Sequence, residues 1–557
     1  MDAYVTTTAR LNSSSIPATI ASRLVSFVFM AGILCVCSRQ AVAATCESLS
    51  SLKLPDTTIT LAQVVEAGAF TPSGAAANLP GAAASRYKEL PAFCRVTATV
   101  KPTPDSDIKI EVWMPLSGWN GKFQGEGNGG FAGVIAYPAL AGGLSLGYST
   151  AGTDTGHAAA GTDASWALGH PEKVIDFGYR GIHEMTVKAK AIVRAFYGKD
   201  LQRSYFGSCS DGGREALMEA QRFPEDYDGI LAGAPANYWT HLLMAGAWEA
   251  QALMKDPASY IPAAKIPALG AAVNAACDKQ DGVADGVIND PRACHFDPSV
   301  LLCKGEDSNS CFTAPQVVAL KKVYDGPTNS KGQPLYVGRV PGAEDGPGGW
   351  VTWITGSAPG KSLQYAFTTN FFKYMVFNNP DWDFKTFNFD SDLKTDDEKQ
   401  ARNVNSTDPN LKPFRARGGK LIIYHGWNDP AISPLNTINY YNSVLSTVGA
   451  RESGDFLRLY LVPGMQHCGG GPGPNSFGQQ AGSTADAQHN IYAALEQWVE
   501  KGIAPGTIVA TKYVSDLNPQ QGVKFSRPLC PYPQIIKYKG SGDTNDAANF
   551  ACAQGKK

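Results

Sequence analysis

Three residues whose types could together carry out nucleophilic acyl transfer occur along the chain in the order Ser210, Asp429, His467. In this chemistry an imidazole accepts the proton of a serine hydroxyl, and a carboxylate holds the imidazole in the required tautomer. Each of the three residues follows a short apolar run that is typical of a buried strand. Because open α/β sheets place their sites at the carboxyl ends of such strands, the sequence predicts Ser210 as nucleophile, His467 as base and Asp429 as orienting acid.

Ser210 lies in a cluster of small residues between a predicted strand and a predicted helix. A nucleophile held in a sharp strand-to-helix turn needs small residues two positions before and after it, and Ser208 and Gly212 fill those positions. If Cys209 were the nucleophile instead, Asp211 would take one of these positions and is too large. The register favours the serine, although a cluster of Gly and Ser is also compatible with an ordinary loop.

A second histidine and two glycines belong to the same candidate site. His425 is a rival base, but it lies closer to Asp429 along the chain than expected for partners on separate loops, so we interpret it as structural. Acyl transfer also needs donors to the oxyanion: the backbone N–H after the nucleophile, here Asp211, and one from a Gly-rich turn after an early strand. We predict Gly129 for the second donor, with Gly130 as the alternative; both also fit a plain turn.

The elements that must position these residues alternate between strand and helix. Apolar patterning predicts strands at 108–116, 204–207, 227–235, 420–424 and 456–462, and a helix within 175–196. Strand, helix and strand in this order imply a parallel sheet covered by helices. Together with the order serine, acid, histidine, this predicts the α/β class and an α/β-hydrolase fold.

The alternation stops between residues 239 and 412, where short apolar runs are interrupted by many Asn, Asp, Pro and Gly. This change of character predicts a large inserted lid domain at 239–412, between a first core part at 44–238 and a second at 413–557. Six aromatic residues of the later lid fit either a lid core or the walls of an aromatic pocket. They are Trp350, Trp353, Tyr365, Phe367, Phe371 and Phe372.

Residues 1–43 have the composition of a secretory signal peptide. Arg10 and Arg23 precede or flank an apolar run at 24–37, and small residues at 41–44 supply a cleavage site. The run is too short for a spanning helix, although an uncleaved membrane anchor is the alternative interpretation. We expect a secreted or periplasmic protein that has no membrane contact after signal cleavage.

The charge balance gives no sign of a polyanionic partner. The chain has 48 Lys and Arg against 50 Asp and Glu, and only 18% of its residues are charged, so we expect no nucleic-acid binding. With 557 residues, of which 43% are hydrophobic, it is long enough for one large domain with an insertion, or for two domains.

The mature chain retains ten cysteines, and an even number in an exported protein argues for disulfides. They are Cys46, Cys94, Cys209, Cys277, Cys294, Cys303, Cys311, Cys468, Cys530 and Cys552. No Cys-x-x-Cys pair suggests zinc. Cys209 and Cys468 directly adjoin Ser210 and His467, so they would be close if those two residues meet; free buried thiols are the alternative there.

A loop of the predicted lid carries carboxylates that could wrap a hard cation. Residues 278–290 contain several Asp, with glycines that let the chain fold back, and lie between Cys277 and Cys294. Oxygen ligands of this kind suit calcium, although the loop lacks the spacing and the final Glu of an EF-hand. A solvated acidic loop is the alternative interpretation.

Four motifs taken together resemble the tannase/feruloyl esterase family, which includes the enzyme that hydrolyses mono(2-hydroxyethyl) terephthalate. They are the stretches 209–215, 424–430, 462–468 and the lid loop at 277–290, and the resemblance covers nearly the whole mature chain. It implies an α/β-hydrolase fold with a lid, catalysis by Ser210, Asp429 and His467, and an oxyanion donor at Asp211.

The resemblance further implies a structural calcium ion and a cysteine pairing. The ligands would be the carboxylates of Asp278, Asp281 and Asp285 and the backbone carbonyls of Val283 and Val287. The disulfides would join Cys46 to Cys94, Cys209 to Cys468, Cys277 to Cys294, Cys303 to Cys311 and Cys530 to Cys552.

The expected reaction is hydrolysis of small esters of phenolic aromatic acids, feruloyl or galloyl, through an acyl-serine. A terephthalate monoester is less expected, because its free carboxylate needs a cation over the pocket and no Arg occurs from Val340 to Ala401; Lys361 or Lys373 would have to substitute. The alternative from another class is a non-catalytic, calcium-stabilised secreted binding protein. The intact serine, acid and histidine argue against it.

Overall fold

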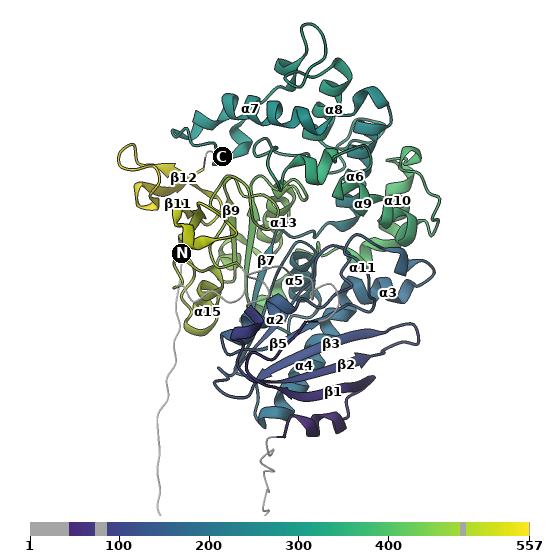
Figure 1. Ribbon diagram of the computed structural model, residues 1–557, viewed down its shortest axis with the longest axis vertical. Helices are drawn as coiled ribbons and strands as arrows, with labels where there is room; N and C mark the ends of the chain where they lie inside the picture. Colours follow the sequence, from purple (N-terminus) through teal and green to yellow (C-terminus); the bar gives the residue numbers. More distant parts are fainter. Residues whose placement is uncertain (1–43, 73–85, 480–485, 556–557) are drawn as a thin grey trace, which may run out of the picture. The chain divides into compact units, whose positions relative to one another are not determined.

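A nine-stranded mixed sheet forms the centre of the computed structural model, which describes residues 44–72, 86–479 and 486–555 (Figure 1). In spatial order the strands are β1 (Thr57–Val65), β2 (Phe93–Val100), β3 (Ile108–Pro115), β5 (Ser149–Thr153), β4 (Lys122–Glu126), β6 (Arg203–Cys209), β7 (Gly229–Gly233), β8 (Lys420–Gly426) and β9 (Leu457–Val462). The strands from β5 to β9 run parallel, whereas β1, β2 and β3 are antiparallel to their neighbours. The predicted signal peptide lies outside the described residues.

Helices cover both faces of this sheet, as the alternation of patterns predicts. One face carries α4 (Gly181–Tyr197), α5 (Asp211–Arg222) and α13 (Pro434–Val448), and the other carries α2 (Tyr137–Ser145) and α15 (Ile491–Lys501). Shorter helices join them: α3 (Pro171–Ile175), α12 (Lys412–Ala416) and α14 (Ala450–Ser453). None of the described helices has the length and apolarity needed to cross a bilayer.

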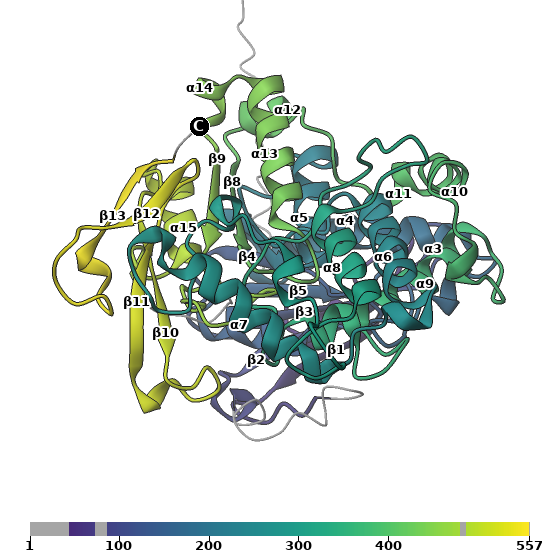
Figure 2. The same cartoon turned by 90° about the horizontal axis from the view of Figure 1, so that it is seen from above.

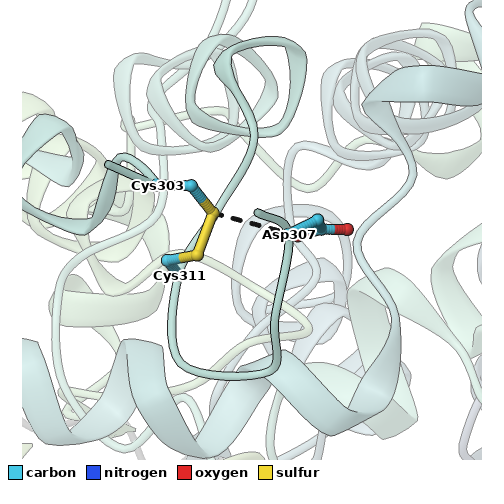
Figure 3. A group of neighbouring side chains, drawn as sticks. All are labelled: Cys303, Asp307 and Cys311. Carbon is cyan, nitrogen blue, oxygen red and sulfur yellow. Dashed lines mark hydrogen bonds between the residues drawn. A yellow bond between two sulfur atoms is a disulfide. The ribbon is translucent and has the colours of Figure 1, made fainter. Parts of the chain in front are cut away.

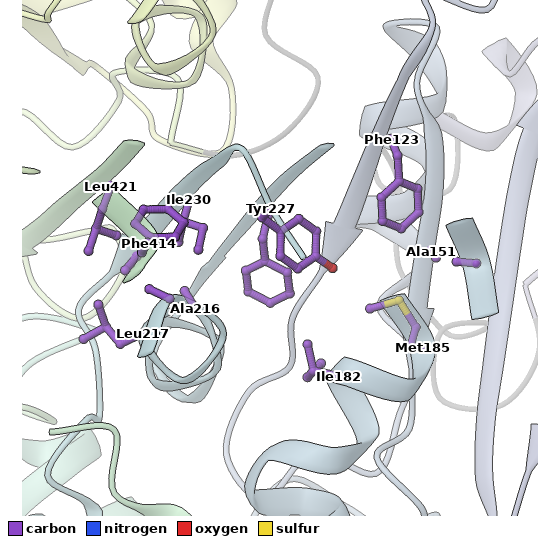
Figure 4. Packing of buried hydrophobic residues seen from close by; sticks show 14 of the residues in the cluster. Phe123, Ala151, Ile182, Met185, Ala216, Leu217, Tyr227, Ile230, Phe414 and Leu421 are labelled. Carbon is purple, nitrogen blue, oxygen red and sulfur yellow. The ribbon is translucent and has the colours of Figure 1, made fainter. Parts of the chain in front are cut away.

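The largest cluster of buried side chains lies between the sheet and the first group of helices. Phe123 of β4 and Ile230 of β7 belong to it, together with Met185 of α4 and Leu217 of α5 (Figure 4). Because the parallel strands are covered on both faces, β7, β8 and β9 appear in the sequence as mainly apolar runs, whereas the short strands β4 and β5 do not. Full burial of one such side chain stabilises the fold by about 1.5–3 kcal/mol, so this cluster fixes the strand ends that carry the candidate site.

Between β7 and β8 the chain leaves the sheet and forms a helical lid. The lid helices are α6 (Trp239–Met254), α7 (Ile266–Cys277), α8 (Ala314–Asp325), α9 (Leu363–Asn370), α10 (Ser391–Asp396) and α11 (Arg402–Val404) (Figure 2). The lid aromatics divide between two uses. Trp350, Phe371 and Phe372 are buried in clusters of the lid, whereas Trp353 and Phe367 also border the candidate site.

The chain ends in two small antiparallel sheets that the sequence analysis does not predict. One pairs β10 (Ile508–Tyr513) with β11 (Val523–Leu529), and the other pairs β12 (Gln534–Tyr538) with β13 (Phe550–Gln554). Arg527 of β11 forms an ion pair with Asp285 of the lid loop, and Ile536 of β12 shares a buried cluster with Val283. The C-terminal segment therefore packs against the lid.

Five disulfides join the ten cysteines in the pairing that the family resemblance implies. In the lid, Cys303 and Cys311 lie beside Asp307 in an arrangement that could suggest a metal site (Figure 3). The two sulfur atoms are bonded to each other, so neither is available as a thiolate ligand. This group therefore closes a loop of the lid and holds no metal.

Candidate active site

Ser210 occupies the turn between β6 and α5 in a strained backbone conformation. Its φ is 68° and its ψ is −122°, and a non-glycine residue at such a φ is uncommon. Neighbouring groups approach closely here, since a Cβ on Gly212 would lie 2.0 Å from the Ser208 hydroxyl oxygen and 2.9 Å from the backbone carbonyl oxygen of Asn128. The strained turn therefore places Ser210 between β6 and α5, with its hydroxyl within reach of a side chain from another loop.

The three residues singled out from the sequence meet at the carboxyl ends of β6, β8 and β9. His467 Nε2 lies 2.8 Å from Ser210 Oγ, and His467 Nδ1 lies 2.7 Å from Asp429 Oδ2. A serine, an imidazole and a carboxylate joined in this way can transfer the serine proton as the oxygen attacks a carbonyl. The geometry needed for nucleophilic acyl transfer is therefore present.

Asp429 is held in its charged form. Burial alone would raise the pKa of its carboxyl group, but the neighbouring imidazoles of His467 and His425 outweigh this effect and lower that pKa. The other carboxylate oxygen accepts hydrogen bonds from the backbone N–H groups of Ala431 and Ile432, at 2.8 and 2.9 Å. The carboxylate is thereby fixed in both charge and orientation.

His425 contacts the same carboxylate oxygen of Asp429 as His467 does. Its Nε2 is 3.2 Å from Asp429 Oδ2 and 3.0 Å from the carbonyl oxygen of Ile432, and its Nδ1 is 2.8 Å from the Thr437 hydroxyl. The side chain is fully buried. All its polar contacts are to the loop and helix that follow β8, so it braces Asp429 and does not reach Ser210.

The three candidate oxyanion donors have backbone N–H groups that are available to a ligand. Within the described residues, the backbone N–H groups of Asp211, Gly129 and Gly130 make no hydrogen bond to another protein group. Gly130 borders the same hollow as Ser210 and Asp211, whereas Gly129 borders a different one. The placement favours Gly130, the alternative of the sequence analysis, over Gly129.

Glu215 supports this glycine turn, a role that the sequence analysis missed. Its buried carboxyl group accepts a hydrogen bond from the backbone N–H of Asn128 at 2.8 Å, and the Asn128 carbonyl accepts one from Gly212 at 2.9 Å. Burial, followed by the negative charge of Asp211, raises the pKa of Glu215 well above its usual range. The sequence signal that could have identified this role is an acidic residue on the buried face of the helix that follows the nucleophile.

A narrow apolar hollow of about 40 Å³ opens directly at Ser210. Its walls come mainly from the lid and from the loop after Asp429. They include Trp239, Leu242, Leu243, Trp353, Phe367 and Ile432. The Trp353 ring stands edge-on to His467, with 4.9 Å between the ring centres. Neither Lys nor Arg is among the described residues that border this hollow.

A disulfide joins the two loops that carry the nucleophile and the base. Cys209 precedes Ser210, Cys468 follows His467, and their Cα atoms are 6.0 Å apart. The bond spans 259 positions of the sequence. It therefore fixes the separation between two loops that belong to different parts of the chain.

The acidic lid loop has features that fit a hard cation. Burial, followed by the charges of Asp285 and Asp278, raises the pKa of Asp281 to about 6, because these carboxylates repel one another. The carbonyls of Val283 and Val287 accept no hydrogen bond from a described residue. Oxygen donors of both kinds are the ligands that calcium prefers.

The same carboxylates are also contacted by other protein groups. Asp278 accepts a hydrogen bond from the backbone of Gly286 at 2.8 Å, and Asp285 pairs with Arg527. The three carboxylate groups are not all within 4.8 Å of one another. An ion would have to draw these carboxylates together. The types of oxygen donor in the loop fit calcium, but the distances between the carboxylates are too long.

A parallel sheet covered by helices, with serine, imidazole and carboxylate at its strand ends, defines an α/β-hydrolase. The model of the family described as "Tannase and feruloyl esterase" matches residues 94–553. An uncharacterized esterase of Xanthomonas campestris is 42% identical, with 94% of this chain and 93% of that protein covered.

The chain is also similar to a hydrolase whose name states its substrate and to a protein whose crystal structure has been solved. The mono(2-hydroxyethyl) terephthalate hydrolase of Piscinibacter sakaiensis is 36% identical over 83% of this chain and 85% of its own length. The crystal structure of feruloyl esterase B from Aspergillus oryzae aligns with a TM-score of 0.82 at 30% identity, covering 91% of this chain and 99% of that one. The chain belongs to the tannase and feruloyl esterase family and is a carboxylic ester hydrolase, which confirms the predicted family, fold class and enzyme class.

Proposed function

We propose that this enzyme hydrolyses esters of phenolic aromatic acids, feruloyl or galloyl, with Ser210 as its nucleophile. The observation that carries the proposal is the hollow at Ser210, which is narrow, apolar and bordered by aromatic rings from the lid. Such walls favour a planar aromatic acyl group, because aromatic rings favour edge-on and offset contacts with one another, and the hollow of about 40 Å³ would widen to admit it. Relatives named as feruloyl esterases support the same substrate class.

In the proposed reaction, His467 takes the proton of Ser210 as the serine oxygen attacks the ester carbonyl. Asp429 stabilises the imidazolium that forms, and the backbone N–H groups of Asp211 and Gly130 donate to the oxyanion. The imidazolium then gives its proton to the departing alcohol. Water, activated by His467, hydrolyses the acyl-serine and regenerates the enzyme.

A neutral acyl group suits the hollow better than a charged one. Gln364 is the one uncharged side-chain amide among the described residues that border it, and it can exchange hydrogen bonds with a phenolic hydroxyl group. A terephthalate monoester would place a carboxylate there without a cation, and the burial of an unpaired charge is costly. This reasoning places phenolic acids ahead of terephthalate.

Hydrolysis of terephthalate monoesters is the second candidate function. It is favoured by one observation, the 36% identity to the terephthalate monoester hydrolase of Piscinibacter sakaiensis. In that case Lys361 or Lys373 of the lid would have to pair with the free carboxylate. Neither residue borders the hollow as the structure describes it.

Calcium and export complete the proposal. Asp278, Asp281 and Asp285, with the carbonyls of Val283 and Val287, would hold a structural calcium ion that stabilises the lid loop. Five disulfides and the predicted signal peptide support a secreted or periplasmic protein that has no membrane contact after cleavage. The balanced charge supports the absence of a nucleic-acid partner.

The substrate class is tested with methyl ferulate, methyl gallate and mono(2-hydroxyethyl) terephthalate on one preparation of enzyme. We expect the highest kcat/KM for one of the two phenolic esters. A higher kcat/KM for the terephthalate ester would replace the proposal with the second candidate function. Failure to hydrolyse any of the three would remove both.

A further inference from the structure

One histidine and two acidic side chains meet near the end of α5 that is remote from Ser210. His183 lies on α4, Glu219 on α5 and Asp226 in the connection between α5 and β7. One potential ligand atom from each, the imidazole Nδ1 or a carboxylate oxygen, lies within 4.8 Å of the other two. Glu219 is eight residues after Asp211. It therefore lies about 12 Å further along the helix axis, and the reaction at Ser210 uses none of the three side chains.

Glu219 is the member of this cluster whose burial needs an explanation. The residue is 1% exposed, and neither oxygen of its carboxyl group has a hydrogen-bond donor among the described residues. Burial of a carboxylate in this way, without a donor, is costly. Burial, followed by the negative charge of Asp226, raises the pKa of Glu219 well above its usual range. The carboxyl group can therefore keep a proton or bind a cation.

The imidazole of His183 is already oriented toward these carboxyl groups. Its Nδ1 lies 2.6 Å from Asp226 Oδ2, and its ring stacks on that of Phe223 with 3.8 Å between the ring centres. The side chain is 30% exposed, so the ring can carry its proton on Nε2 when Nδ1 binds an ion. A tetrahedral ion with bonds of about 2.0–2.1 Å would separate its ligand atoms by about 3.3 Å, a small change from the present spacing.

Lys190 is the neighbouring cation, but it does not neutralise the two carboxyl groups by contact. Its Nζ donates to the backbone carbonyl oxygen of Asp226 and lies 5.2 Å from the centre of the Tyr227 ring. Within the described part of the chain it forms no ion pair with a carboxylate. Its charge opposes the rise in the pKa of Glu219 without cancelling it. Glu219 therefore has no cationic partner in direct contact.

The types of donor atom decide which ion fits this cluster. Zinc binds imidazole nitrogen together with carboxylate oxygen, most often in a tetrahedral arrangement. Calcium and magnesium favour oxygen ligands and higher coordination numbers, so the imidazole disfavours both. Three protein ligands leave a fourth position, which water can fill from the exposed side of His183.

We propose that His183, Glu219 and Asp226 form a zinc site that ties α4 to the end of α5 and to the connection before β7. The site is separate from the acidic lid loop, and it does not depend on the substrate proposed for Ser210. Because α5 begins directly after Ser210, an ion near its other end would hold the helix on which the nucleophile turn is built. Zinc should stabilise the folded enzyme and take no part in the reaction.

Zinc titration of chelator-treated enzyme without a polyhistidine tag tests the site. Calcium is kept in excess to occupy the acidic lid loop, and zinc binding is measured by calorimetry. We expect one zinc ion per chain at this site. Glu219→Gln and His183→Gln should each weaken its binding by at least about 100-fold, because loss of a ligand should exceed the 10–100-fold cost of losing an outer hydrogen-bond partner. Zinc should raise the melting temperature of the parent enzyme and of neither variant.

His489 provides the matched control. Its Nδ1 lies 2.9 Å from Asp486 Oδ1, as in the pair of His183 and Asp226, but no third ligand from a described residue is within reach. His489→Gln should therefore bind zinc with the affinity of the parent enzyme. Because His183 is partly exposed, His183→Gln still decides the question if the buried variant Glu219→Gln does not fold.

Anomalous diffraction at the zinc absorption edge locates the ion. A peak between His183, Glu219 and Asp226 would confirm the assignment. A peak at other histidines alone, the absence of bound zinc, or parental affinity in both glutamine variants would overturn it. Glu219 would then keep its proton and share it with Asp226. None of these measurements requires hydrolysis of an ester, so the zinc site and the proposed function are tested separately.

Discussion

At the scale of single residues, Ser210, His467 and Asp429 should differ in how much kcat falls when each is replaced. We expect Ser210→Ala and His467→Ala each to lower kcat for methyl ferulate by several orders of magnitude, because the covalent route is lost while the oxyanion donors remain. Asp429→Asn should lower kcat by about 10⁴-fold, the size seen when an orienting carboxylate of this kind is replaced.

The control for these three variants is stability. Ser210 and His467 are partly exposed, so their alanine variants should melt close to the parent temperature. Near-normal esterase activity in purified Ser210→Ala would rule out the mechanism, whatever the behaviour of the other two variants.

Ser210, Asp429 and His467 were predictable because each one follows an apolar run that is recognisable as a buried strand. The elbow is visible from Ser208 and Gly212, which must be small for the turn to form. The choice between Gly129 and Gly130 was not predictable, because it depends on which of the two residues borders the hollow at Ser210. Glu215 was missed for the same reason: its partner Asn128 is distant in sequence.

At the scale of elements, the bond between Cys209 and Cys468 joins the elbow to the loop of the base. In the chain-entropy model a closed loop of about 100 residues stabilises by about 4.7 kcal/mol, and this loop is longer. We expect replacement of both cysteines by Ala to lower kcat more than it raises KM, measured well below the variant's melting temperature, because rate depends steeply on the distance from serine to imidazole.

The matched control is the double alanine variant of Cys303 and Cys311, whose disulfide lies in the lid. It should leave kcat unchanged. A stable Cys209→Ala/Cys468→Ala enzyme with parental kcat would limit this disulfide to a role in stability.

The acidic lid loop should give calcium-dependent stability that changes with pH in a defined direction. Without the ion, the pKa of Asp281 is about 6 in the folded protein against 3.8 for the free group. Folding therefore favours its protonated form, and the contribution of Asp281 to stability is present at low pH and lost as pH rises through about 6. Calcium binds the deprotonated form, so its effect has the opposite sign.

We therefore expect the difference in melting temperature between calcium-loaded and chelator-treated enzyme to grow as pH rises from about 4 to about 7. Asp278→Asn should remove most of this difference, and methyl ferulate turnover should change only through unfolding. Equal melting curves at pH 7, with no metal in the purified enzyme, would contradict the site.

Element boundaries show where sequence patterns suffice. The runs at 108–116 and 456–462 correspond closely to β3 and β9. The first alternates apolar and polar residues in an antiparallel strand, and the second is a mainly apolar run in a parallel strand. The helix predicted within 175–196 consists of a π-helical turn (Asp176–Arg180) and α4, and α3 directly precedes it. A change from α-helical to π-helical hydrogen bonding does not alter the spacing of apolar residues enough to be recognised from the sequence.

At the scale of the whole molecule, the point where strand–helix alternation stops and resumes predicts the insertion between β7 and β8. Five strands of the central sheet were predicted, whereas β1, β2, β4 and β5 were not. The two C-terminal sheets were not predicted either. Their strands are short, partly exposed and stabilised by contacts with the distant lid, such as that between Arg527 and Asp285. Patterns within a window of residues cannot report a partner so far away in the chain.

The separation of nucleophile and base along the chain also determines how long after the serine the histidine is synthesised. Ser210 and His467 are separated by 257 positions, so at about 5–20 residues per second the ribosome adds the histidine roughly 13–50 s after the serine. For most of that interval β8 and β9 have not been made, so β7 lacks its outer neighbours, and the Cys209 thiol has no partner until Cys468 is added. An emerging chain therefore carries a serine that cannot react with esters, and esterase activity begins only when nearly the whole polypeptide has been made.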